Sequence, residues 1–411
     1  MTQVLKNRRH LGFRRQGLIS LALMGVLLTL AACASSAGSS VPPGTTPGAH
    51  TATPGASATA TGAAQGGNPT ATPGGSGGGG GPSLSQLTVY VGADDDNFYG
   101  VNAANGTLRW KIATDGEAGK PTESNGVVYF GTDAGDLYAV NHGSLVWHEK
   151  LSGSLIGGRP AVDNGMVFVA SVNGGSGIIY GLDQNNGSIR WQYNTSEQIE
   201  GGASVGDGKV FAGSTDEYLY ALNESDGSLA WRTSVGNPIE FTSPADANGV
   251  VYVGSDGGEL NAINDSTGAE IWKYQTGQAP SGRPAISNGV VFFGSQDGSV
   301  YAVNASSGSL VWSFSTGSSI NGSSIISNGS IIFIASSNGS FYALYTSNGH
   351  QAWRFEGKDY GPNGRSWPST TQGVVYIGGS DGYLYSFQGS NGAIVWKYQI
   401  GGEVSSPFVG Q

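Results

Sequence analysis

The sequence predicts an all-β fold, an eight-bladed β-propeller whose blades are four-stranded antiparallel sheets. Trp recurs eight times at intervals of 37 to 44 residues, and a Gly stands four residues before each of these Trp. Short runs of β-branched and aromatic residues fill the intervals and end in Asn-Gly or Asp-Gly turns, which are hairpin signals. A repeat of roughly 40 residues with several short strands is typical of a propeller.

Composition excludes several classes of protein. The 411 residues include 70 Gly, one Cys and five His, and the formal charge is −10. One Cys rules out a disulfide scaffold and any zinc or iron–sulfur site built from Cys. An excess of negative charge disfavours contact with phosphate backbones. We therefore expect no nucleic-acid partner and no metal centre rich in His or Cys.

Residues 1–32 are typical of a secretory signal peptide. The first 16 residues carry five Lys and Arg and no acid, and an uncharged, mostly apolar run follows from Leu18 to Ala32. This order of a basic segment, a short apolar segment and small residues marks a cleaved signal. The run is shorter than the roughly 20 residues that a membrane-spanning helix needs.

The cleavage region, Leu30-Ala31-Ala32-Cys33, resembles the lipobox of bacterial lipoproteins. The resemblance implies that Cys33 becomes the acylated N-terminus and that its acyl chains, palmitate among them, hold the mature protein in a membrane. We expect an extracytoplasmic location on the outer face of the bacterial cell membrane, or on the periplasmic side where there is an outer membrane. The alternative is ordinary cleavage nearby, which leaves Cys33 unmodified.

Residues 33–83 are predicted to be the lipidated Cys followed by a disordered tether. From Ala34 to Ser83 there is no charged residue, and Ala, Ser, Thr, Gly and Pro dominate. Such a segment lacks the apolar groups that would offset the entropy of ordering it. We expect it to hold the folded domain, residues 84–411, away from the membrane surface.

The unit at residues 250–287 illustrates the expected sequence repeat. Residues 250–254, 259–263, 269–274 and 282–287 read as strands, with turns between them. The first unit begins directly at Leu87 and lacks an inner strand, whereas residues 405–409 resemble the inner strands of the other units. We therefore expect the C-terminal strand to complete blade 1 and to close the ring, which removes an open sheet edge.

The repeat resembles that of pyrroloquinoline quinone (PQQ) β-propellers, in which a Gly turn and a Trp form a docking motif between blades. All eight units match, so the resemblance covers the whole folded region. It implies a structural role for two sets of residues, which are Trp110, Trp147, Trp191, Trp231, Trp272, Trp312, Trp353 and Trp396, and Gly106, Gly143, Gly187, Gly227, Gly268, Gly308, Gly349 and Gly392.

A lipobox joined to an eight-bladed propeller is also similar to the BamB family, lipoproteins of the outer-membrane assembly machinery that act as scaffolds. The resemblance implies a binding or scaffold role with a protein partner, although the long tether differs from that family's short linker. The alternative is a PQQ-dependent dehydrogenase. The chain has no paired Cys, and its repeats of about 41 residues leave little room for insertions that hold a cofactor. We therefore expect no PQQ, no calcium and no enzyme activity.

The sequence contains no catalytic motif in the structural context that catalysis requires. Residues 202–206 match G-x-S-x-G, but they lie on a predicted inner strand rather than at the strand–turn–helix that a nucleophile elbow requires. His142 and His148 are close in sequence without a third ligand near them, so no metal site is predicted there. The Asp94-Asp95-Asp96 run lacks the spaced pattern of a calcium loop. We read these acids as turn residues, and we expect a monomer.

Binding residues are expected on one face, around the centre of the ring. Lys120, Arg159 and Arg283 occupy equivalent positions on inner strands, just before a Pro, and Trp367 occupies the same position in blade 8. The connection before Trp367 is the longest of its kind and contains Lys358, Tyr360 and Arg365. Aromatic and Arg residues dominate binding hot spots, so these residues predict a site for a protein surface or an anionic glycan.

Two alternatives stay open for these residues. Each cation could pair with a nearby acid such as Glu200, Glu240 or Glu403, since buried charges are usually paired. Trp367 could simply fill the centre of the ring, because a large aromatic side chain is also a good core residue.

Overall fold

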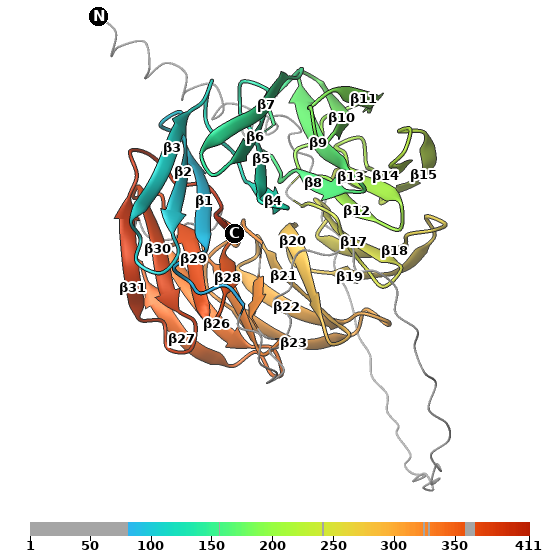
Figure 1. Ribbon diagram of the computed structural model, residues 1–411. Helices are drawn as coiled ribbons and strands as arrows, with labels where there is room; N and C mark the ends of the chain where they lie inside the picture. The colour runs from blue at the N-terminus through green and yellow to red at the C-terminus, as the bar shows by residue number, and fades with distance from the viewer. Residues whose placement is uncertain (1–80, 156, 241, 324, 328, 358–365) are drawn as a thin grey trace, which may run out of the picture. The chain divides into compact units, whose positions relative to one another are not determined.

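The computed structural model describes residues 81–411, apart from residues 156, 241, 324, 328 and 358–365 (Figure 1). These residues belong to the second of two compact units, Ala63–Gln411. They form 32 strands in eight four-stranded sheets, which confirms the predicted eight-bladed propeller. Within this described part, no helix is long and apolar enough to cross a membrane. Cys33 and residues 34–80 of the predicted tether lie outside the described residues, whereas residues 81–83 are described and the Pro82 carbonyl accepts a hydrogen bond from the Gln372 side chain.

Blades 1 to 4 follow one another along the chain. Their strands, from the inner to the outer strand of each blade, are β32 (Phe408–Gly410), β1 (Thr88–Ala93), β2 (Asn97–Asn102) and β3 (Leu108–Ala113); β4 (Thr122–Ser124), β5 (Val127–Gly131), β6 (Asp136–Asn141) and β7 (Ser144–Lys150); β8 (Ala161–Asp163), β9 (Met166–Asn173), β10 (Ser176–Asp183) and β11 (Ile189–Asn194); β12 (Ser204–Gly206), β13 (Lys209–Gly213), β14 (Tyr218–Asn223) and β15 (Leu229–Ser234).

Blades 5 to 8 repeat the pattern. Their strands, in the same order, are β16 (Ala245–Ala247), β17 (Val250–Ser255), β18 (Glu259–Asn264) and β19 (Glu270–Gln275); β20 (Pro280–Ser287), β21 (Val290–Ser295), β22 (Ser299–Asn304) and β23 (Leu310–Ser315); β24 (Ile325–Ser327), β25 (Ile331–Ala335), β26 (Ser340–Tyr345) and β27 (Gln351–Glu356); β28 (Ser369–Thr371), β29 (Val374–Gly378), β30 (Tyr383–Gln388) and β31 (Ile394–Gln399).

The C-terminal strand closes the ring. β32 pairs antiparallel with β1, with Phe408 opposite Tyr90 and Val409 opposite Val89, and a further bridge joins Ala93 to Val404. Blade 1 is therefore built from both ends of the propeller, which confirms the closure expected from residues 405–409.

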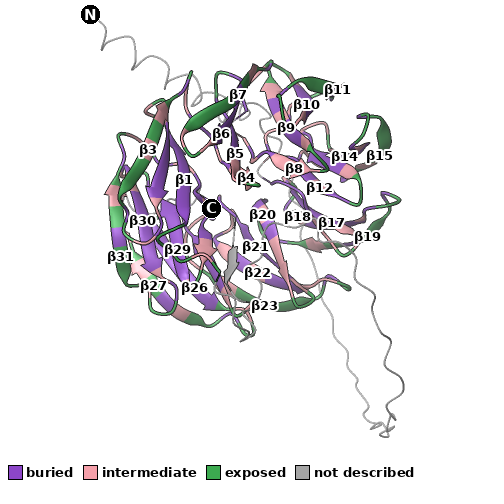
Figure 2. Ribbon diagram, viewed as in Figure 1, coloured by how far each residue is buried: buried purple, intermediate pink, exposed green. Residues whose placement is uncertain are grey.

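Burial follows the position of a strand in its blade. The two middle strands are almost wholly buried, as in β17 and β18, because adjacent blades cover both of their faces. The outermost strands alternate, and only the Trp side of β19 is buried while its neighbours are exposed. Figure 2 shows this change from buried middle strands to exposed outer strands such as β3, β11 and β15.

Each seam between blades is made by a Trp ring that lies over a Gly of the next blade. A Cβ added to Gly308 would lie 2.7 Å from the Trp272 ring, and the Trp272 indole N–H donates to the Ala305 carbonyl over 2.9 Å. The last seam repeats this contact between Trp396 and Gly106. All eight of these Gly have φ between 68° and 81°, a left-handed conformation that favours Gly.

The remaining seams have the same geometry. The rings of Trp110, Trp147, Trp191, Trp231, Trp312 and Trp353 lie over Gly143, Gly187, Gly227, Gly268, Gly349 and Gly392 in that order.

Candidate functional site

Eight equivalent residues, one from each blade, lie around the axis of the ring, either just before the inner strand or, for Arg283, within it. In blade order they are Ser406, Lys120, Arg159, Gly202, Ser243, Arg283, Ser323 and Trp367. Three of the Ser share one role, since each hydroxyl oxygen accepts a hydrogen bond from a backbone N–H of the preceding blade. Ser243 accepts from Gly202 and Ser406 accepts from Trp367, both over 2.8 Å, and Ser323 accepts from Arg283. These bonds join the inner strands of neighbouring blades.

At this position blades 2 and 3 carry the cations Lys120 and Arg159 instead of a Ser. The Arg159 guanidinium donates to the Pro121 carbonyl over 2.9 Å and to the Pro407 carbonyl over 2.8 Å. It therefore reaches from blade 3 past blade 2 to blade 1. Lys120 donates from its Nζ to the Gly157 carbonyl over 2.8 Å. Backbone carbonyls thus fix both cations but do not neutralise their charge.

Trp367 lies against both cations. The Lys120 Nζ is 4.4 Å from the centre of the Trp367 ring, and the Arg159 Cζ is 5.6 Å from it. Cations within about 6 Å of an indole face are attracted to it, more strongly where water is excluded. Trp367 is 8% exposed, so it packs into the ring as well as supporting the cations. We refer to Lys120, Arg159, Arg283 and Trp367 as the axial cluster.

The electrostatics of the axial cluster are those of unneutralised positive charge. Burial lowers the pKa of Lys120 to about 8, and repulsion by Arg159 acts in the same direction. Burial likewise lowers the pKa of Arg159 to about 9, with a contribution from Arg283. Burial also lowers the pKa of Arg283, although Asp246 opposes this. Lys120 and Arg159 are therefore still cationic at neutral pH.

One alternative for these cations was pairing with a nearby acid, and the described residues show no such pair. Among the residues that the structure describes, four ion pairs and one contact between a His and an Asp form, and none of them involves Lys120, Arg159 or Arg283. Converging unpaired cations are an unusual arrangement, because buried charges are normally paired. The axial cluster is therefore suited to receive an anionic group.

Acids lie around the axial cluster on the face where the outer strands return to the inner ones. Glu117 is on such a connection, and its N–H donates to the Asp133 carboxylate over 2.8 Å. Burial and the charge of Asp133 raise the pKa of Glu117 to about 7. Burial and the charge of Glu240 raise the pKa of Asp256 to about 6. The face thus has a positive centre and acidic groups outside it.

The structure brings together four of the seven predicted binding residues. Lys358, Tyr360 and Arg365 lie outside the described residues, so their part in the site stays a prediction. The hairpin of β9 and β10 is longer than its counterparts and turns at Gly174, whose carbonyl accepts a hydrogen bond from the Gln198 side chain.

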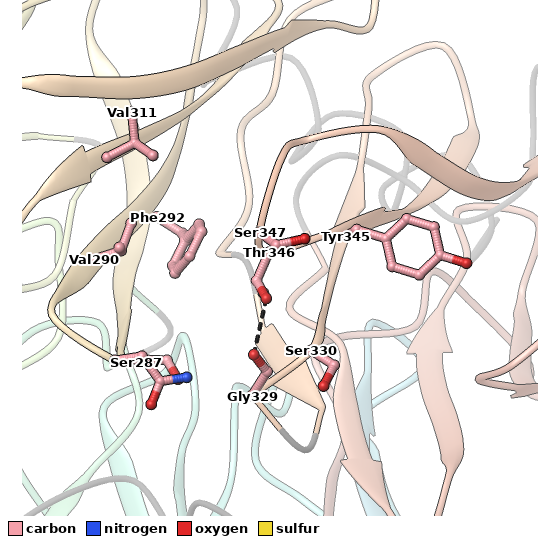
Figure 3. Close-up of a pocket in the computed structure, with 10 residues that line it drawn as sticks. Ser287, Val290, Phe292, Val311, Gly329, Ser330, Tyr345, Thr346 and Ser347 are labelled. Atoms are coloured by element: carbon pink, nitrogen blue, oxygen red, sulfur yellow. Dashed lines mark hydrogen bonds between the residues drawn. The ribbon is translucent and has the colours of Figure 1, made fainter.

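A separate hollow of about 440 Å³ lies between blades 6 and 7 (Figure 3). Its lining includes Val290, Phe292, Val311 and Tyr345, and the other lining residues are uncharged. It contains none of the predicted binding residues, so it is distinct from the axial cluster.

Comparison with known proteins agrees with this architecture. The family model described as outer membrane protein assembly factor BamB matches residues 55–142, 118–200, 175–281 and 257–409. No curated protein matches the chain. The crystal structure of BamB from Moraxella catarrhalis is 20% identical with a TM-score of 0.60, and the match covers 72% of this chain and 89% of that one. These findings confirm the resemblance expected from the sequence.

Two other solved structures show how widely the fold is shared. The computationally designed Ika8 protein is 16% identical with a TM-score of 0.65, over 73% of this chain and 93% of that one. Quinohemoprotein alcohol dehydrogenase from Comamonas testosteroni is 13% identical with a TM-score of 0.60, over 78% of this chain and 72% of that one. At these identities the likeness establishes the fold alone.

Proposed function

The chain belongs to the family of the outer membrane protein assembly factor BamB, and from that membership we propose that it is a lipid-anchored extracytoplasmic scaffold. The propeller binds a protein partner at the face that surrounds the axial cluster. The observation that carries this proposal is the convergence of Lys120 and Arg159 on Trp367 without an acid at ion-pair distance among the described residues. An acidic side chain or a terminal carboxylate of the partner supplies the missing charge.

The acidic surroundings add selectivity. A partner with a broad acidic surface is repelled by groups such as Glu117, Asp133 and Asp256, whereas a single carboxylate on a neutral or basic surface reaches the centre of the ring. An acidic protrusion within a basic surface therefore fits this face best.

Cross-linking in the source cells tests the binding proposal. We expect an envelope protein to cross-link to the wild-type chain and to be lost with Trp367→Ala. Arg283→Gln is a second variant for the case that Trp367→Ala unfolds, because no hydrogen bond of the described residues depends on the Arg283 guanidinium. Asp226→Ala is the control, since Asp226 is exposed on a turn of the opposite face. Loss with Asp226→Ala alone would refute the choice of face.

The anionic glycan is the competing ligand for the same site. Retention of the wild-type propeller on an immobilised polyuronate, lost with Arg283→Gln while the cross-linked proteins stay unchanged, would identify the glycan instead of a protein.

Anchoring is tested separately. Because Cys33 follows Leu-Ala-Ala and is the single Cys of the chain, we expect the membrane-extracted protein to carry acyl groups on this residue. Mass spectrometry of the N-terminal peptide measures the modification, and Cys33→Ser should move the protein into the unbound fraction. Equal membrane retention of Cys33→Ser would contradict the proposal.

The quinoprotein alternative rests on the shared fold. The axial cluster provides cations and an indole, and the carboxylates of the described residues make no ion pair with it. These donors do not fit calcium, which takes six or more oxygens. Titration with PQQ, with and without calcium, distinguishes the two functions, because calcium-dependent binding would favour the dehydrogenase class.

A further inference from the structure

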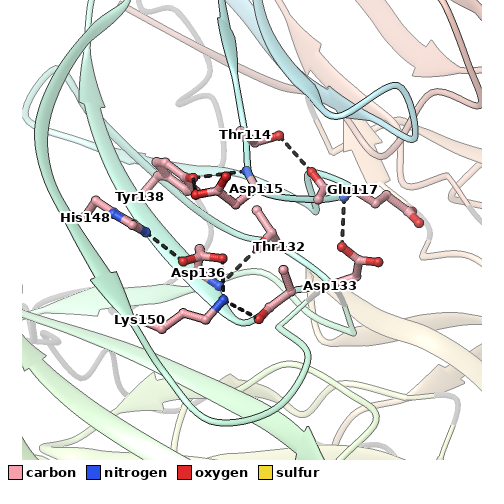
Figure 4. A network of polar contacts seen from close by, with 11 residues as sticks. Thr114, Asp115, Glu117, Thr132, Asp133, Asp136, Tyr138, His148 and Lys150 are labelled. Carbon is pink, nitrogen blue, oxygen red and sulfur yellow. Dashed lines mark hydrogen bonds and ion pairs between the residues drawn. The ribbon is translucent and has the colours of Figure 1, made fainter.

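A second polar cluster lies on the same face, where blade 1 leads into blade 2 (Figure 4). Asp115, Asp136 and His148 each place a possible ligand atom within 4.8 Å of the others. Sequence spacing did not reveal this cluster, because Asp115 belongs to the connection that follows β3 whereas Asp136 and His148 lie on β6 and β7. The fold thus supplies the further ligands that the sequence around His148 lacks.

Strand pairing fixes two of the three ligands. Tyr138 is opposite His148 and Asp136 is opposite Lys150 in the register of β6 and β7. Side chains two residues apart on a strand point the same way, so these four share one face of the sheet. The His148 Nε2 lies 2.7 Å from the Asp136 Oδ1. Asp136 itself is only 2% exposed.

Tyr138 positions the third ligand as well as the imidazole. Its ring stacks on the His148 ring with centroids 4.7 Å apart. Its hydroxyl accepts a hydrogen bond from the Asp115 N–H over 3.2 Å and donates to the Asp115 Oδ2 over 3.4 Å. One side chain therefore holds Asp115 and His148 in place on either side of the Asp136 carboxylate.

Lys150 leaves one oxygen of Asp136 available. Its Nζ is 2.8 Å from the Asp136 Oδ2 and 2.7 Å from the Ala134 carbonyl, while the Asp136 N–H donates to the Thr132 hydroxyl. The Oδ1 faces His148 instead. A carboxylate whose second oxygen is held by an outer hydrogen bond is typical of metal ligands, because the outer partner orients it.

We propose that Asp115, Asp136 and His148 bind a divalent transition-metal ion of the zinc type. Zinc takes His nitrogen at about 2.0–2.1 Å and carboxylate oxygen at about 2.0–2.2 Å, with water in any remaining position. Neighbouring ligand atoms of a tetrahedral ion are then roughly 3.3 Å apart. The ion takes the place of the proton between the His148 Nε2 and the Asp136 Oδ1, and these atoms separate by about half an ångström. This proton moves to the His148 Nδ1, or to water if both ring nitrogens carried one, so the imidazole that binds the ion is neutral.

The net negative charge of the cluster favours a cation. Two carboxylates supply two negative charges, and Lys150 offsets one of them. Glu117 and Asp133 lie in the same network and add negative potential (Figure 4). A neutral imidazole and carboxylates suit zinc, nickel and copper better than magnesium or calcium, which prefer oxygen ligands alone. The site does not depend on the scaffold function proposed above.

Calorimetric titration of the full chain with zinc chloride tests the proposal. We expect saturable binding that His148→Ala weakens at least tenfold, and a similar loss with Asp115→Asn. His142→Ala is the matched control, because His142 is an exposed His of the same blade outside the cluster. Thermal unfolding of each variant without metal verifies the fold.

Three results would overturn the site. These are no saturable zinc binding, equal binding by His148→Ala and the wild type, or a loss that occurs only with His142→Ala. Tighter binding of calcium than of zinc would overturn the assigned class of metal. Cobalt(II) gives a second readout, since its visible spectrum should report a nitrogen and oxygen environment in the wild type and be lost with His148→Ala.

Discussion

The seams between blades and the axis of the ring are both repeated eight times, but they differ in how the repeats vary. At every seam the same two residue types meet, a Trp and a Gly with positive φ. At the axis the equivalent position is occupied by Ser, Gly, Lys, Arg or Trp. Packing therefore fixes the seam, whereas the axis tolerates several residue types. In a repeat fold, functional residues are therefore expected at the positions where the residue type differs from one repeat to the next.

Three predictions test this comparison, in order of expected effect. The largest concerns closure, on which both regions depend. Deleting residues 404–411 removes β32 and the buried side chains of Val404 and Phe408, and it exposes the edge of β1. We expect the free energy of unfolding to fall by about 5 kcal/mol or more, with aggregation. Urea unfolding and size-exclusion chromatography measure both.

The exposed C-terminal residue provides the control for closure. Removing Gln411 alone keeps the pairing of β32 with β1 and removes only the carbonyl that accepts a hydrogen bond from the Tyr90 hydroxyl, so the free energy of unfolding should fall by about 1 kcal/mol, far less than with the larger deletion. If the deletion of residues 404–411 unfolded like the full chain, the ring would not depend on its C-terminal strand.

The second prediction separates seam packing from backbone strain. Gly308→Ala and Gly289→Ala both place a Cβ at a φ near 70°, which costs roughly 1–2 kcal/mol. Only the Cβ at position 308 meets a ring, at 2.7 Å from Trp272, whereas nothing lies within 4 Å of the Cβ at position 289. We expect Gly308→Ala to be the less stable by a further 1–3 kcal/mol or so in chemical denaturation. Equal losses would mean that the seam relaxes freely.

The sequence predicted the fold and the seams because both follow from local repetition. The Gly turns and the spacing of the Trp recur in every unit, so the strands assigned in one unit can be assigned in all eight. The equivalent positions of Lys120, Arg159 and Arg283 followed from the same alignment of repeats. The stacking of Lys120 and Arg159 on Trp367 did not, because those residues come from blades 2, 3 and 8 and meet only once the ring closes.

The cluster of Asp115, Asp136 and His148 was missed for a related reason. Its members belong to two consecutive repeats, and the hydroxyl of Tyr138 that holds Asp115 is visible only with the strands in register. The sequence contains only a weak indication of this cluster. His148 stands two residues before Lys150 on a predicted outer strand, and Asp136 opens the neighbouring strand.

The third prediction concerns unpaired charge at the axis. Lys120 has a pKa of about 8 in the folded protein, below the value of about 10.5 that applies when it is unfolded. Between these values the unfolded chain binds more protons at this residue, so its contribution to stability rises with pH over that window. Lys120→Met removes the contribution. We therefore expect the variant to be more stable than the wild type near pH 7, by about 1–3 kcal/mol, and the gap to narrow by pH 10.

Comparing the two proteins at each pH cancels the Tyr residues that titrate in the same range, such as Tyr252, whose pKa burial raises. Urea unfolding at pH 7, 8.5 and 10 measures the difference in unfolding free energy between Lys120→Met and the wild type. An anion that binds in the axial cluster should make the wild type the more stable of the two proteins at pH 7, because it stabilises the wild type and not the variant. If the difference in unfolding free energy between Lys120→Met and the wild type does not change with pH, the charge of Lys120 is compensated. The seams and the axis would then differ in shape alone.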